Sequence, residues 1–370
     1  MKILFLTRSI NNVLGGLERQ ILEISENLSS GNHTIMVVSL DSGEINSFYG
    51  IPAKSKVVWH GLGVGSPNRK ANLREKVRRQ TELIKVICKF DPDVSVSFMI
   101  GAFIYSRLPH FICRKKLILS ERNSPDIYKL TSAKRFRYLY FFLMLFAKKI
   151  IVQFDSYKYK YPRFLWHKIS TIPNSIAINT DVEIGLSDDI PQFVYAGRFS
   201  FQKQLDKLIQ IFVAYRNQGG VGKLGLYGDG EAKTEIEELI KQLGGNEYIS
   251  INPPVTDLSK IFSNTKINCL FSIWEGFPNS LAEGLKAGIP AVGFKSCDGV
   301  SNLIINNYNG WLMKDDGNYI NSGMKLLEID NMAKEEFNII KSNCKESVAK
   351  YEDHIIFEKW TNLFYSIKSS

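Results

Sequence analysis

Two glutamates frame the segment whose chemistry is easiest to interpret in this chain of 370 residues. Seven residues separate Glu275 from Glu283. Pro278 is typical of the first turn of a helix and Gly288 of the residue after its end, so we expect Glu283 on a helix and Glu275 in the loop before it. Amides at a helix start bind anionic oxygens, and carboxylates accept hydrogen bonds from paired hydroxyls. The spacing predicts a crevice for a sugar, a ribose diol and the phosphates between them, beside Gly276, Phe277, Pro278, Asn279 and Ser280.

In the alternative interpretation, Glu275 is an ordinary surface acid and Glu283 is an acid that interacts with the helix dipole.

Two cations, Arg198 and Lys203, follow another predicted strand at residues 192–197 and precede the helical pattern 204–215. In open α/β sheets, ligands bind at the carboxyl ends of the strands, and a helix start adds its dipole to nearby positive charge. We predict an anion site suited to a diphosphate, with two solvated surface charges as the alternative.

Glycines occupy two further turns between a predicted strand and a predicted helix. Gly228 and Gly230 allow close approach of the backbone to a ligand, or a plain turn that caps the next helix. Gly15 and Gly16 precede the helical pattern 17–28. Neither a G-x-G-x-x-G fingerprint nor a P-loop lysine accompanies them, so a dinucleotide site and a kinase-type site are not indicated.

Glu121 and Arg122 follow the strand-like run 116–120. We expect them to face the same ligand, with a local ion pair as the alternative.

Apolar runs that lead into these residues alternate with helical patterns along the chain. We expect strands at residues 2–7, 34–40, 94–98, 116–120, 149–154, 168–172, 192–197, 223–228 and 266–272, and helices at 17–28, 69–90, 204–215, 231–243 and 356–367. Continuous apolar strands between helices are typical of parallel sheets covered on both faces. The predicted fold is α/β, with two Rossmann-like doubly wound domains facing a cleft, where ligands of such folds bind.

A polar, acidic stretch at residues 180–192 interrupts this alternation after Pro173 and Asn174. We expect a Rossmann-like domain at 1–178, a linker at 179–191 and a second Rossmann-like domain, binding a nucleotide sugar, at 192–350. The final helix, in residues 351–370, is expected to pack back on the first domain. The chain length agrees with two domains.

Composition is globular, with 44% apolar and 23% charged residues. Five cysteines occur without CxxC spacing, so zinc and redox motifs are not indicated, and most are expected to be small core residues. Their odd number and the lack of a signal peptide favour a reducing cytoplasm. The net charge of +10 permits nucleic-acid binding, but no helix-turn-helix, RNP or zinc pattern supports it, so we expect no nucleic acid partner.

Positive charge is concentrated between Arg107 and Lys168, where 15 Lys or Arg stand against 3 Asp or Glu. Within this block, ten uncharged, mostly apolar residues separate Arg137 from Lys148. A membrane-spanning helix needs about 20 apolar residues, so segment 134–149 is too short to cross a bilayer. Its basic ends and aromatic middle favour contact with an anionic membrane surface. A core helix with basic ends is the alternative.

The segment 272–292 resembles the Glu-x7-Glu segment of family-four retaining glycosyltransferases, which have the GT-B architecture. AGRFSFQKQLDKLI (196–209) looks like that family's Gly-Arg and Lys segment, and YGDGE (227–231) like its Gly-x-Gly turn. IPNSI (172–176), GGLERQ (15–20) and SERNSP (120–125) are similar to its segment before the linker, its amino-terminal glycine loop and an acceptor-side loop of some bacterial members. The matches follow the family's order over nearly the whole chain.

The resemblance implies that Arg198 and Lys203 hold the nucleotide diphosphate as it leaves, that Glu275 contacts the donor sugar and that Glu283 binds the ribose. It implies that Gly15 and Gly16 shape the donor and acceptor sides of the cleft, and that no metal or cofactor takes part. The chain departs from the family's pattern at Gln204, where Gly is usual, and at residues 120–123, where many members have a His near the sugar. Residues 299–302 also lack the usual Pro and Glu.

Together these features predict a retaining, metal-independent hexosyltransferase. Its donor would be a nucleotide sugar, and we expect it to be UDP-linked. Its acceptor would be a polyprenyl-diphosphate-linked glycan in O-antigen (lipopolysaccharide) or capsule synthesis. The enzyme is expected in the cytoplasm, peripheral on the inner face of the plasma membrane. A nucleotide-sugar epimerase or phosphorylase of the same fold is the alternative.

Overall fold

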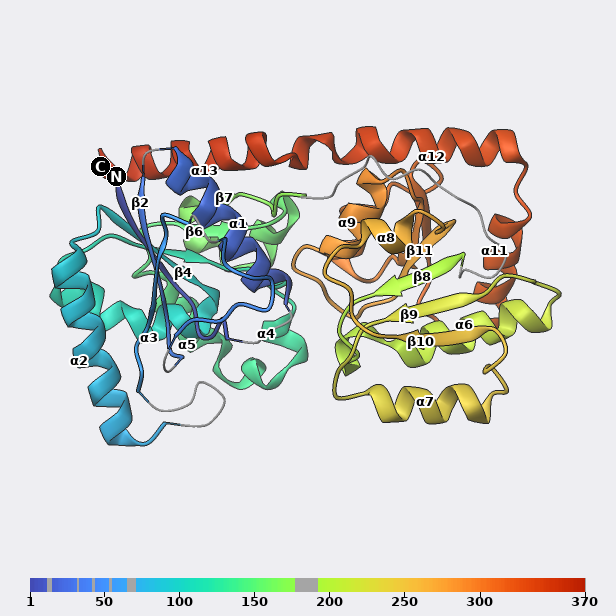
Figure 1. Ribbon diagram of the computed structural model, residues 1–370, viewed down its shortest axis with the longest axis horizontal. Helices are drawn as coiled ribbons and strands as arrows, with labels where there is room; N and C mark the ends of the chain where they lie inside the picture. Colours follow the sequence, from blue (N-terminus) through green and yellow to red (C-terminus); the bar gives the residue numbers. More distant parts are fainter. Residues whose placement is uncertain are drawn as a thin grey trace. The chain divides into compact units, whose positions relative to one another are not determined.

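The computed structural model describes residues 1–11, 15–31, 33–41, 44–52, 55–64, 71–176 and 192–369. The chain forms two compact units (Figure 1). Unit 1 comprises Met1–Ser175 with Asp353–Ser370, and unit 2 comprises Ile176–Glu352. The linker predicted at 179–191 lies outside the described residues.

Unit 1 is built on a seven-stranded sheet in the order β3-β2-β1-β4-β5-β6-β7. Every pair of neighbouring strands is parallel. Strand β4 is buried along its whole length, as expected for a strand covered on both faces, whereas the edge strand β3 is partly exposed. The strands are β1 (Lys2–Leu6), β2 (Thr34–Ser39), β3 (Val58–Gly61), β4 (Val94–Phe98), β5 (Leu117–Ser120), β6 (Ile150–Val152) and β7 (Ile169–Thr171).

Helices cover both faces of this sheet. One face packs against α1 and α13, and the other packs against α3 with α2 beside it (Figure 1). The helices are α1 (Gly16–Ser30), α2 (Leu73–Phe90), α3 (Met99–Ile112), α4 (Ile127–Leu130), α5 (Arg137–Met144) and α13 (Asp353–Lys368), with the 3-10 turns η1 (Ser132–Phe136), η2 (Asp155–Lys160) and η3 (Arg163–Lys168).

The carboxyl-terminal helix α13 belongs to the core of unit 1. Its side chains Ile356, Trp360 and Phe364 are fully buried in the same apolar cluster as Ile3 of β1 and Ile24 of α1. The carboxylate of Asp93 binds both ends of the described chain, because it accepts from the backbone amide of Lys2 and pairs with Lys368. Burial of this aromatic stripe gives the end of the chain a structural role in unit 1.

Helix α2 forms where its apolar spacing predicts, but not all of that repeat is buried. Asn72 and Glu75 make a reciprocal capping box that fixes the helix start. Leu73 and Val77, two of the apolar residues whose repeat predicts this helix, are exposed. The buried residues are Arg79, Leu83, Ile87 and Phe90.

Unit 2 is built on a six-stranded parallel sheet in the order β10-β9-β8-β11-β12-β13. Its strands are β8 (Phe193–Ala196), β9 (Leu224–Tyr227), β10 (Ile249–Asn252), β11 (Ile267–Leu270), β12 (Ala291–Phe294) and β13 (Gly310–Met313). Its helices are α6 (Leu205–Asn217), α7 (Lys233–Gln242), α8 (Ser259–Phe262), α9 (Asn279–Lys286), α10 (Asp298–Ser301), α11 (Tyr319–Asp330) and α12 (Lys334–Val348), with the 3-10 turns η4 (Phe201–Lys203) and η5 (Ala349–Tyr351).

Both sheets therefore have the doubly wound order of Rossmann-like domains, which confirms the predicted α/β fold class. In each sheet the strand order reverses at one point. That point lies between β1 and β4 in unit 1 and between β8 and β11 in unit 2. The loops after these strands are where an open α/β sheet binds its ligands.

Candidate active site

In unit 2, the loops after β8 and β11 bring a predicted cation and a predicted acid into contact. The Nζ atom of Lys203 lies 2.5 Å from Oε1 of Glu275. The same carboxylate oxygen accepts a hydrogen bond of 2.6 Å from the hydroxyl of Ser272. Glu275 is 6% exposed, so the pair is largely withdrawn from water. A charge pair in such surroundings is held in a defined geometry, because each partner loses much if the other moves away.

Backbone contacts hold these two loops together. The amide of Ile273 donates to the carbonyl of Gln202, and the side-chain amide of Gln202 donates to the carbonyl of Trp274. The short turn η4 is followed by Gln204, whose backbone is left-handed with φ of 47°. Glycine adopts this conformation most easily, which explains in physical terms why the family that this segment resembles usually has Gly at this position.

Arg198, the second predicted cation, lies in the same loop between β8 and η4. Its side chain is exposed. Its backbone carbonyl accepts a hydrogen bond of 2.7 Å from the hydroxyl of Tyr195. Within the described part of unit 2, no salt bridge engages the Arg198 guanidinium. The loop therefore presents one cation paired with Glu275 and one that faces solvent.

Gly228 and Gly230 form the neighbouring turn after β9, and both contact the protein's own backbone. A Cβ at Gly228 would lie 1.9 Å from the carbonyl oxygen of Gly197, and one at Gly230 would lie 2.2 Å from that of Phe199. The amide of Phe199 also donates to the carbonyl of Asp229. These glycines thus allow two loops to pack closely and fix the loop that carries Arg198. Contact with substrate stays a prediction for both.

The segment after Glu275 forms the turn and helix that its spacing predicts. Helix α9 begins at Asn279, directly after Pro278, and Gly288 follows its end with φ of 83°. Glu283 lies on α9 and is 4% exposed. Around the helix start, Gly276 and Pro278 are buried, Phe277 packs edge-on against Tyr351, and the carbonyl of Ser280 accepts from Asn268.

Three residues that support Glu275 were not predicted from the sequence. Ser272 donates to its carboxylate, Gln202 joins the two loops, and Gly299 of α10 lies against it. A Cβ at Gly299 would lie 2.5 Å from the Cβ of Glu275. Ser272 is the second residue after β11 and within reach of Glu275 by spacing. Gly299 lies in α10, after the neighbouring strand β12, and no local pattern indicates that it contacts Glu275.

In unit 1, Glu121 and Arg122 point into the protein interior. Glu121 has no exposed surface and accepts a 2.5 Å hydrogen bond from the Tyr128 hydroxyl. Burial raises the pKa of the Glu121 carboxyl to about 7. Arg122 donates to Ser120 and Asn174 and to a backbone carbonyl, and burial lowers its pKa to about 9. No ion pair joins Glu121 to Arg122 in the described structure. Their predicted contact with substrate stays a prediction.

The loop between β1 and α1 is anchored by a buried carboxylate. Asp41 accepts hydrogen bonds from the hydroxyls of Ser9 and Ser39 and from the amide of Ile10. Gly15 is the extended residue before α1, and Gly16 is its first residue. Residues 12–14, which precede them, lie outside the described residues. The predicted role of Gly15 and Gly16 stays a prediction.

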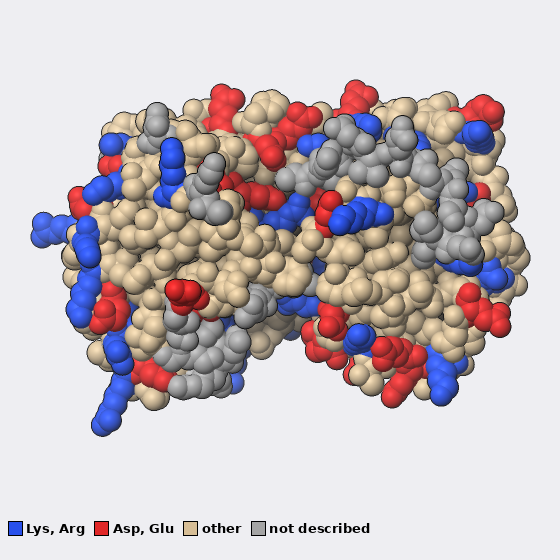
Figure 2. All heavy atoms as spheres, in the orientation of Figure 1, with Lys and Arg blue, Asp and Glu red and all other residues tan. Residues whose placement is uncertain are grey.

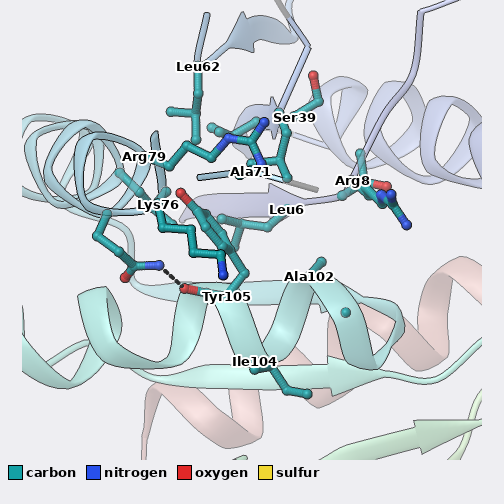
Figure 3. A pocket seen from close by; sticks show the side chains of 16 residues that line it. Leu6, Arg8, Ser39, Leu62, Ala71, Lys76, Arg79, Ala102, Ile104 and Tyr105 are labelled. Atoms are coloured by element: carbon teal, nitrogen blue, oxygen red, sulfur yellow. Dashed lines mark hydrogen bonds between the residues drawn. The ribbon is translucent and has the colours of Figure 1, made fainter. Parts of the chain in front are cut away.

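A pocket of about 430 Å³ opens at the carboxyl edge of the unit 1 sheet, between β1, β2, α2 and α3. That volume is typical of small-molecule sites. Figure 3 shows Lys76 and Arg79 of α2 near Tyr105 of α3, with Arg8 from the loop after β1 at the side. Most other lining residues are apolar: Leu6, Val38, Leu40, Leu62, Ala71, Leu83, Ala102 and Ile104. The pocket combines cations with apolar walls, and its residues were not predicted from the sequence.

Charge around this pocket is mainly positive. No Asp or Glu is among its described lining residues. In Figure 2, Lys and Arg side chains gather along the edge of unit 1 where α2 lies in Figure 1. Helix α2 carries Arg74, Lys76, Arg78, Arg79, Lys85 and Lys89. An anionic ligand would be attracted to this edge.

Over the described ranges, no three His, Cys, Asp or Glu side chains are grouped so that they could hold a metal ion. None of the described helices is both long enough and apolar enough to cross a membrane.

Comparison with known proteins shows which enzymes this chain is similar to. Residues 179–343 match the family model described as glycosyl transferases group 1. The amylovoran biosynthesis glycosyltransferase AmsD of Erwinia amylovora is 26% identical over 98% of this chain and 99% of its own length. A Campylobacter jejuni enzyme is 24% identical over the full length of both chains. It is named GalNAc-alpha-(1->4)-GalNAc-alpha-(1->3)-diNAcBac-PP-undecaprenol alpha-1,4-N-acetyl-D-galactosaminyltransferase.

The fold is shared with solved structures of other proteins. The crystal structure of Anabaena HepE in complex with UDP and glucose superposes with a TM-score of 0.77 at 18% identity, covering 99% of this chain and 100% of that one. At this identity the likeness concerns the fold alone. Residues 179–343 are thus similar to the group 1 glycosyltransferases, the two full-length relatives are named as glycosyltransferases, and the two parallel-sheet units match the fold of the solved structure.

Proposed function

We propose that this enzyme transfers a hexose from a UDP-linked sugar to a lipid-linked glycan, with retention at the anomeric carbon, in the synthesis of O-antigen or capsule. The observation that carries the proposal is the contact between Lys203 and Glu275 at the strand-order reversal of unit 2. A cation, a carboxylate and the start of α9 meet there, which suits a ligand that has both phosphates and sugar hydroxyls.

Lys203 and Arg198 would stabilise the leaving diphosphate. As the bond at the anomeric carbon breaks, negative charge grows on the phosphate oxygens. Cations that are already in position stabilise that charge without reorganising, which is usually the largest contribution to such catalysis. Glu275 holds Lys203 at 2.5 Å before any ligand arrives, and Ser272 holds Glu275. The pair is therefore arranged in advance.

The two carboxylates would bind different parts of the donor. Glu275 would stabilise the positive charge that develops on the sugar ring, since it lies in the loop before α9 rather than on the helix. Glu283, on α9, would accept hydrogen bonds from the ribose hydroxyls. Both are more than nine-tenths buried, so a donor that reaches them must exclude water, which strengthens these interactions.

The acceptor would bind to unit 1, in the pocket between α2 and α3. Its apolar walls suit a prenyl chain, and Arg8, Lys76 and Arg79 suit a diphosphate. The Campylobacter relative is named for an undecaprenol-linked acceptor, which supports the same class here. Replacing Lys76 with Ala should raise KM for a prenyl-diphosphate acceptor while leaving donor affinity unchanged.

An exposed surface of unit 1 would hold the enzyme on the membrane. We call it the aromatic-basic surface, and it consists of Phe136, Tyr138, Leu139, Phe142 and Phe146 with Lys134, Arg135, Arg137, Lys148 and Lys149. These five apolar side chains are all exposed, while Phe141 and Met144 of the same segment face the core. Aromatic side chains beside cations are typical of proteins that lie on anionic membranes.

Vesicle pelleting tests this surface. Neutralising Lys134, Arg135, Lys148 and Lys149 should reduce binding to vesicles that contain anionic lipid, because each cation near the surface contributes about 1 kcal/mol. Unchanged pelleting and unchanged activity would contradict peripheral membrane binding.

A screen of nucleotide sugars tests the reaction itself. A bound donor raises the unfolding temperature by mass action, so the donor can be identified before the acceptor is known. The product is then analysed with and without a prenyl-linked glycan. Transfer that needs the acceptor and keeps the anomeric configuration supports the proposal. Rearrangement of the sugar without acceptor would instead indicate the epimerase alternative, which the relatives described above do not support.

A further inference from the structure

Two cysteines from neighbouring helices of unit 1 bring their sulfur atoms together. The Sγ atoms of Cys88 and Cys113 are 3.3 Å apart. Cys88 lies near the end of α2 and is exposed, and Cys113 follows the end of α3 and is partly exposed. The other three cysteines, Cys269, Cys297 and Cys344, are buried in unit 2. The proposed glycosyl transfer uses none of the five.

We propose that Cys88 and Cys113 form a reversible disulfide that fastens α2 to α3 under oxidising conditions. The oxidant we name is a small-molecule disulfide such as oxidised glutathione. The Cys88 thiolate attacks one of its sulfurs, which forms a mixed disulfide and releases one small thiol. The Cys113 thiolate then attacks the Cys88 sulfur and releases the second. Two cysteine thiols are thus oxidised by two electrons, and one small disulfide is reduced to two thiols, which take up the two protons.

The local geometry favours this bond. A disulfide has an S–S length of about 2.05 Å, so the sulfurs need to approach by little more than 1 Å, which side-chain rotation can provide. The two helices already pack together, and the amide of Gln80 on α2 donates to the carbonyl of Tyr105 on α3. The Cys113 sulfur also lies 4.0 Å from the carbonyl oxygen of Ile84 on α2. Closure therefore joins elements that are already neighbours.

The order of the two steps follows from the surroundings of each thiol. Burial and the neighbouring Cys88 raise the pKa of Cys113 to about 11, so little of it is thiolate at neutral pH. Cys88 is exposed to a reagent in solution, and we expect it to react first. Cys113 is held beside it, where the high local concentration compensates for its low thiolate fraction.

The disulfide would lie away from the pocket that α2 and α3 line, but it would link the same two helices. Lys76, Arg79 and Leu83 of α2 and Ala102 and Tyr105 of α3 line that pocket, whereas Cys88 and Cys113 lie beyond them, toward the other end of each helix. A link at that end limits how far the two helices can separate. This inference does not depend on the proposed sugar, acceptor or mechanism.

Intact-mass measurement of the full chain tests the proposal. The reduced protein is incubated with oxidised glutathione under native conditions, and the mass should fall by that of two hydrogen atoms. Peptide mapping should join the peptide of Cys88 to that of Cys113, and dithiothreitol should restore the original mass. Cys269, Cys297 and Cys344 should stay unmodified, which reports that unit 2 remains folded.

Two single substitutions sharpen this test. Cys113→Ser should stop the reaction at a glutathione adduct on Cys88, and Cys88→Ser should prevent the crosslink altogether. Crosslinked wild type should also melt at a higher temperature than the reduced protein, because a crosslink restricts the unfolded chain. Neither variant should show that rise. A wild-type protein that keeps the glutathione adduct, that stays unmodified, or whose melting temperature does not rise on crosslinking would overturn the proposal.

Discussion

The carboxyl edges of the two sheets differ in how they present polar groups. In unit 2, residues that the sequence singles out meet directly, with Lys203 against Glu275 and Ser272 completing the contact. In unit 1, the predicted Glu121 and Arg122 are turned inward and the open space is lined by other residues. Two sheets of the same topology thus present a polar contact in one unit and a mostly apolar, cationic pocket in the other.

This difference separates two kinds of sequence signal. The unit 2 site joins two short segments, one after β8 and one after β11, and each has a spacing of charged residues that can be recognised in the sequence. The unit 1 pocket draws its lining from β1, β2, α2 and α3, which are distant in sequence. A donor with phosphates and hydroxyls suits the first, and an anion with an apolar body suits the second.

The largest expected effect is the loss of turnover when the unit 2 contact is broken. Lys203→Ala and Glu275→Ala should each lower kcat by about 10²- to 10³-fold, the usual cost of removing one group that stabilises developing charge. Steady-state kinetics with the identified donor measures this. Lys207→Ala is the matched control, since Lys207 follows in α6 and pairs with Asp315 at 2.7 Å outside the site. Near-normal turnover in both site variants would reject their assigned roles.

In unit 1, the pH dependence of stability tests whether Glu121 is an interior group. Its pKa rises from 4.5 to about 7 on folding, so the folded protein holds a proton that the unfolded chain releases. Stability should therefore fall as pH rises from about 4.5 to 7, by about 3 kcal/mol from this group alone. Glu121→Gln removes the titrating group.

Urea unfolding of wild type and Glu121→Gln at pH 5 and pH 8 measures that difference. Between pH 5 and pH 8, the free energy of unfolding of the variant should rise relative to that of wild type. Burial also raises the pKa of Glu23 to about 6, but its contribution cancels in this comparison because both proteins contain Glu23. An unchanged difference would mean that the Glu121 carboxylate is solvated, and so available to a ligand.

The glycine turn after β9 provides a smaller effect on stability. Gly228→Ala places a Cβ against the carbonyl oxygen of Gly197, and backbone must shift to relieve it, at about 1–3 kcal/mol. Turnover should fall as well, because the displaced loop carries Arg198. Gly101→Ala in α3 is the control for stability, since nothing lies within 4 Å of its added Cβ. Equal stability of the two variants would show that the close packing of the unit 2 loops is dispensable.

The smallest effect is expected at Gln204. Gln204→Gly removes the strain of a left-handed backbone from the folded protein, but it also gives the unfolded chain more conformational entropy. These two effects on the free energy of unfolding oppose each other at about 1 kcal/mol each, so they should nearly cancel. Gln204→Val, with a branched side chain at the same φ, should instead destabilise the fold by about 1–2 kcal/mol. Thermal unfolding compares the two. A strongly stabilised Gln204→Gly variant would mean that the Gln backbone is more strained than its φ indicates.

Most strands could be predicted from their apolar runs, whereas three of the four missed strands lie at a sheet edge. The nine predicted strands each coincide with a strand of the structure, from β1 at Lys2–Leu6 to β11 at Ile267–Leu270. Strands β3, β10, β12 and β13 were missed, and three of them, β3, β10 and β13, have a neighbouring strand on one side only. Pairing with a neighbouring strand, rather than local sequence, stabilises such segments.

The aromatic-basic surface illustrates what spacing leaves undecided. Residues 134–149 were predicted either to lie on a membrane or to form a core helix. The structure divides them into η1, the short helix α5 and a turn, with Phe141 and Met144 buried and the other large apolar side chains of α5 partly or largely exposed. Charge and length could not reveal this division, because it depends on which face meets the rest of unit 1.

Affinity for a nucleoside diphosphate tests the central claim most directly. Calorimetric titration would compare wild type, Lys203→Ala, Arg198→Ala and the control Lys207→Ala with whichever of UDP, GDP, ADP and CDP most stabilises the protein. Loss of one charge-assisted contact should raise Kd by about 10- to 100-fold in Lys203→Ala and in Arg198→Ala. The Kd of the control Lys207→Ala should stay near that of wild type. Equal Kd values in all four proteins would mean that the diphosphate binds elsewhere, and the assignment of the unit 2 loops would be wrong.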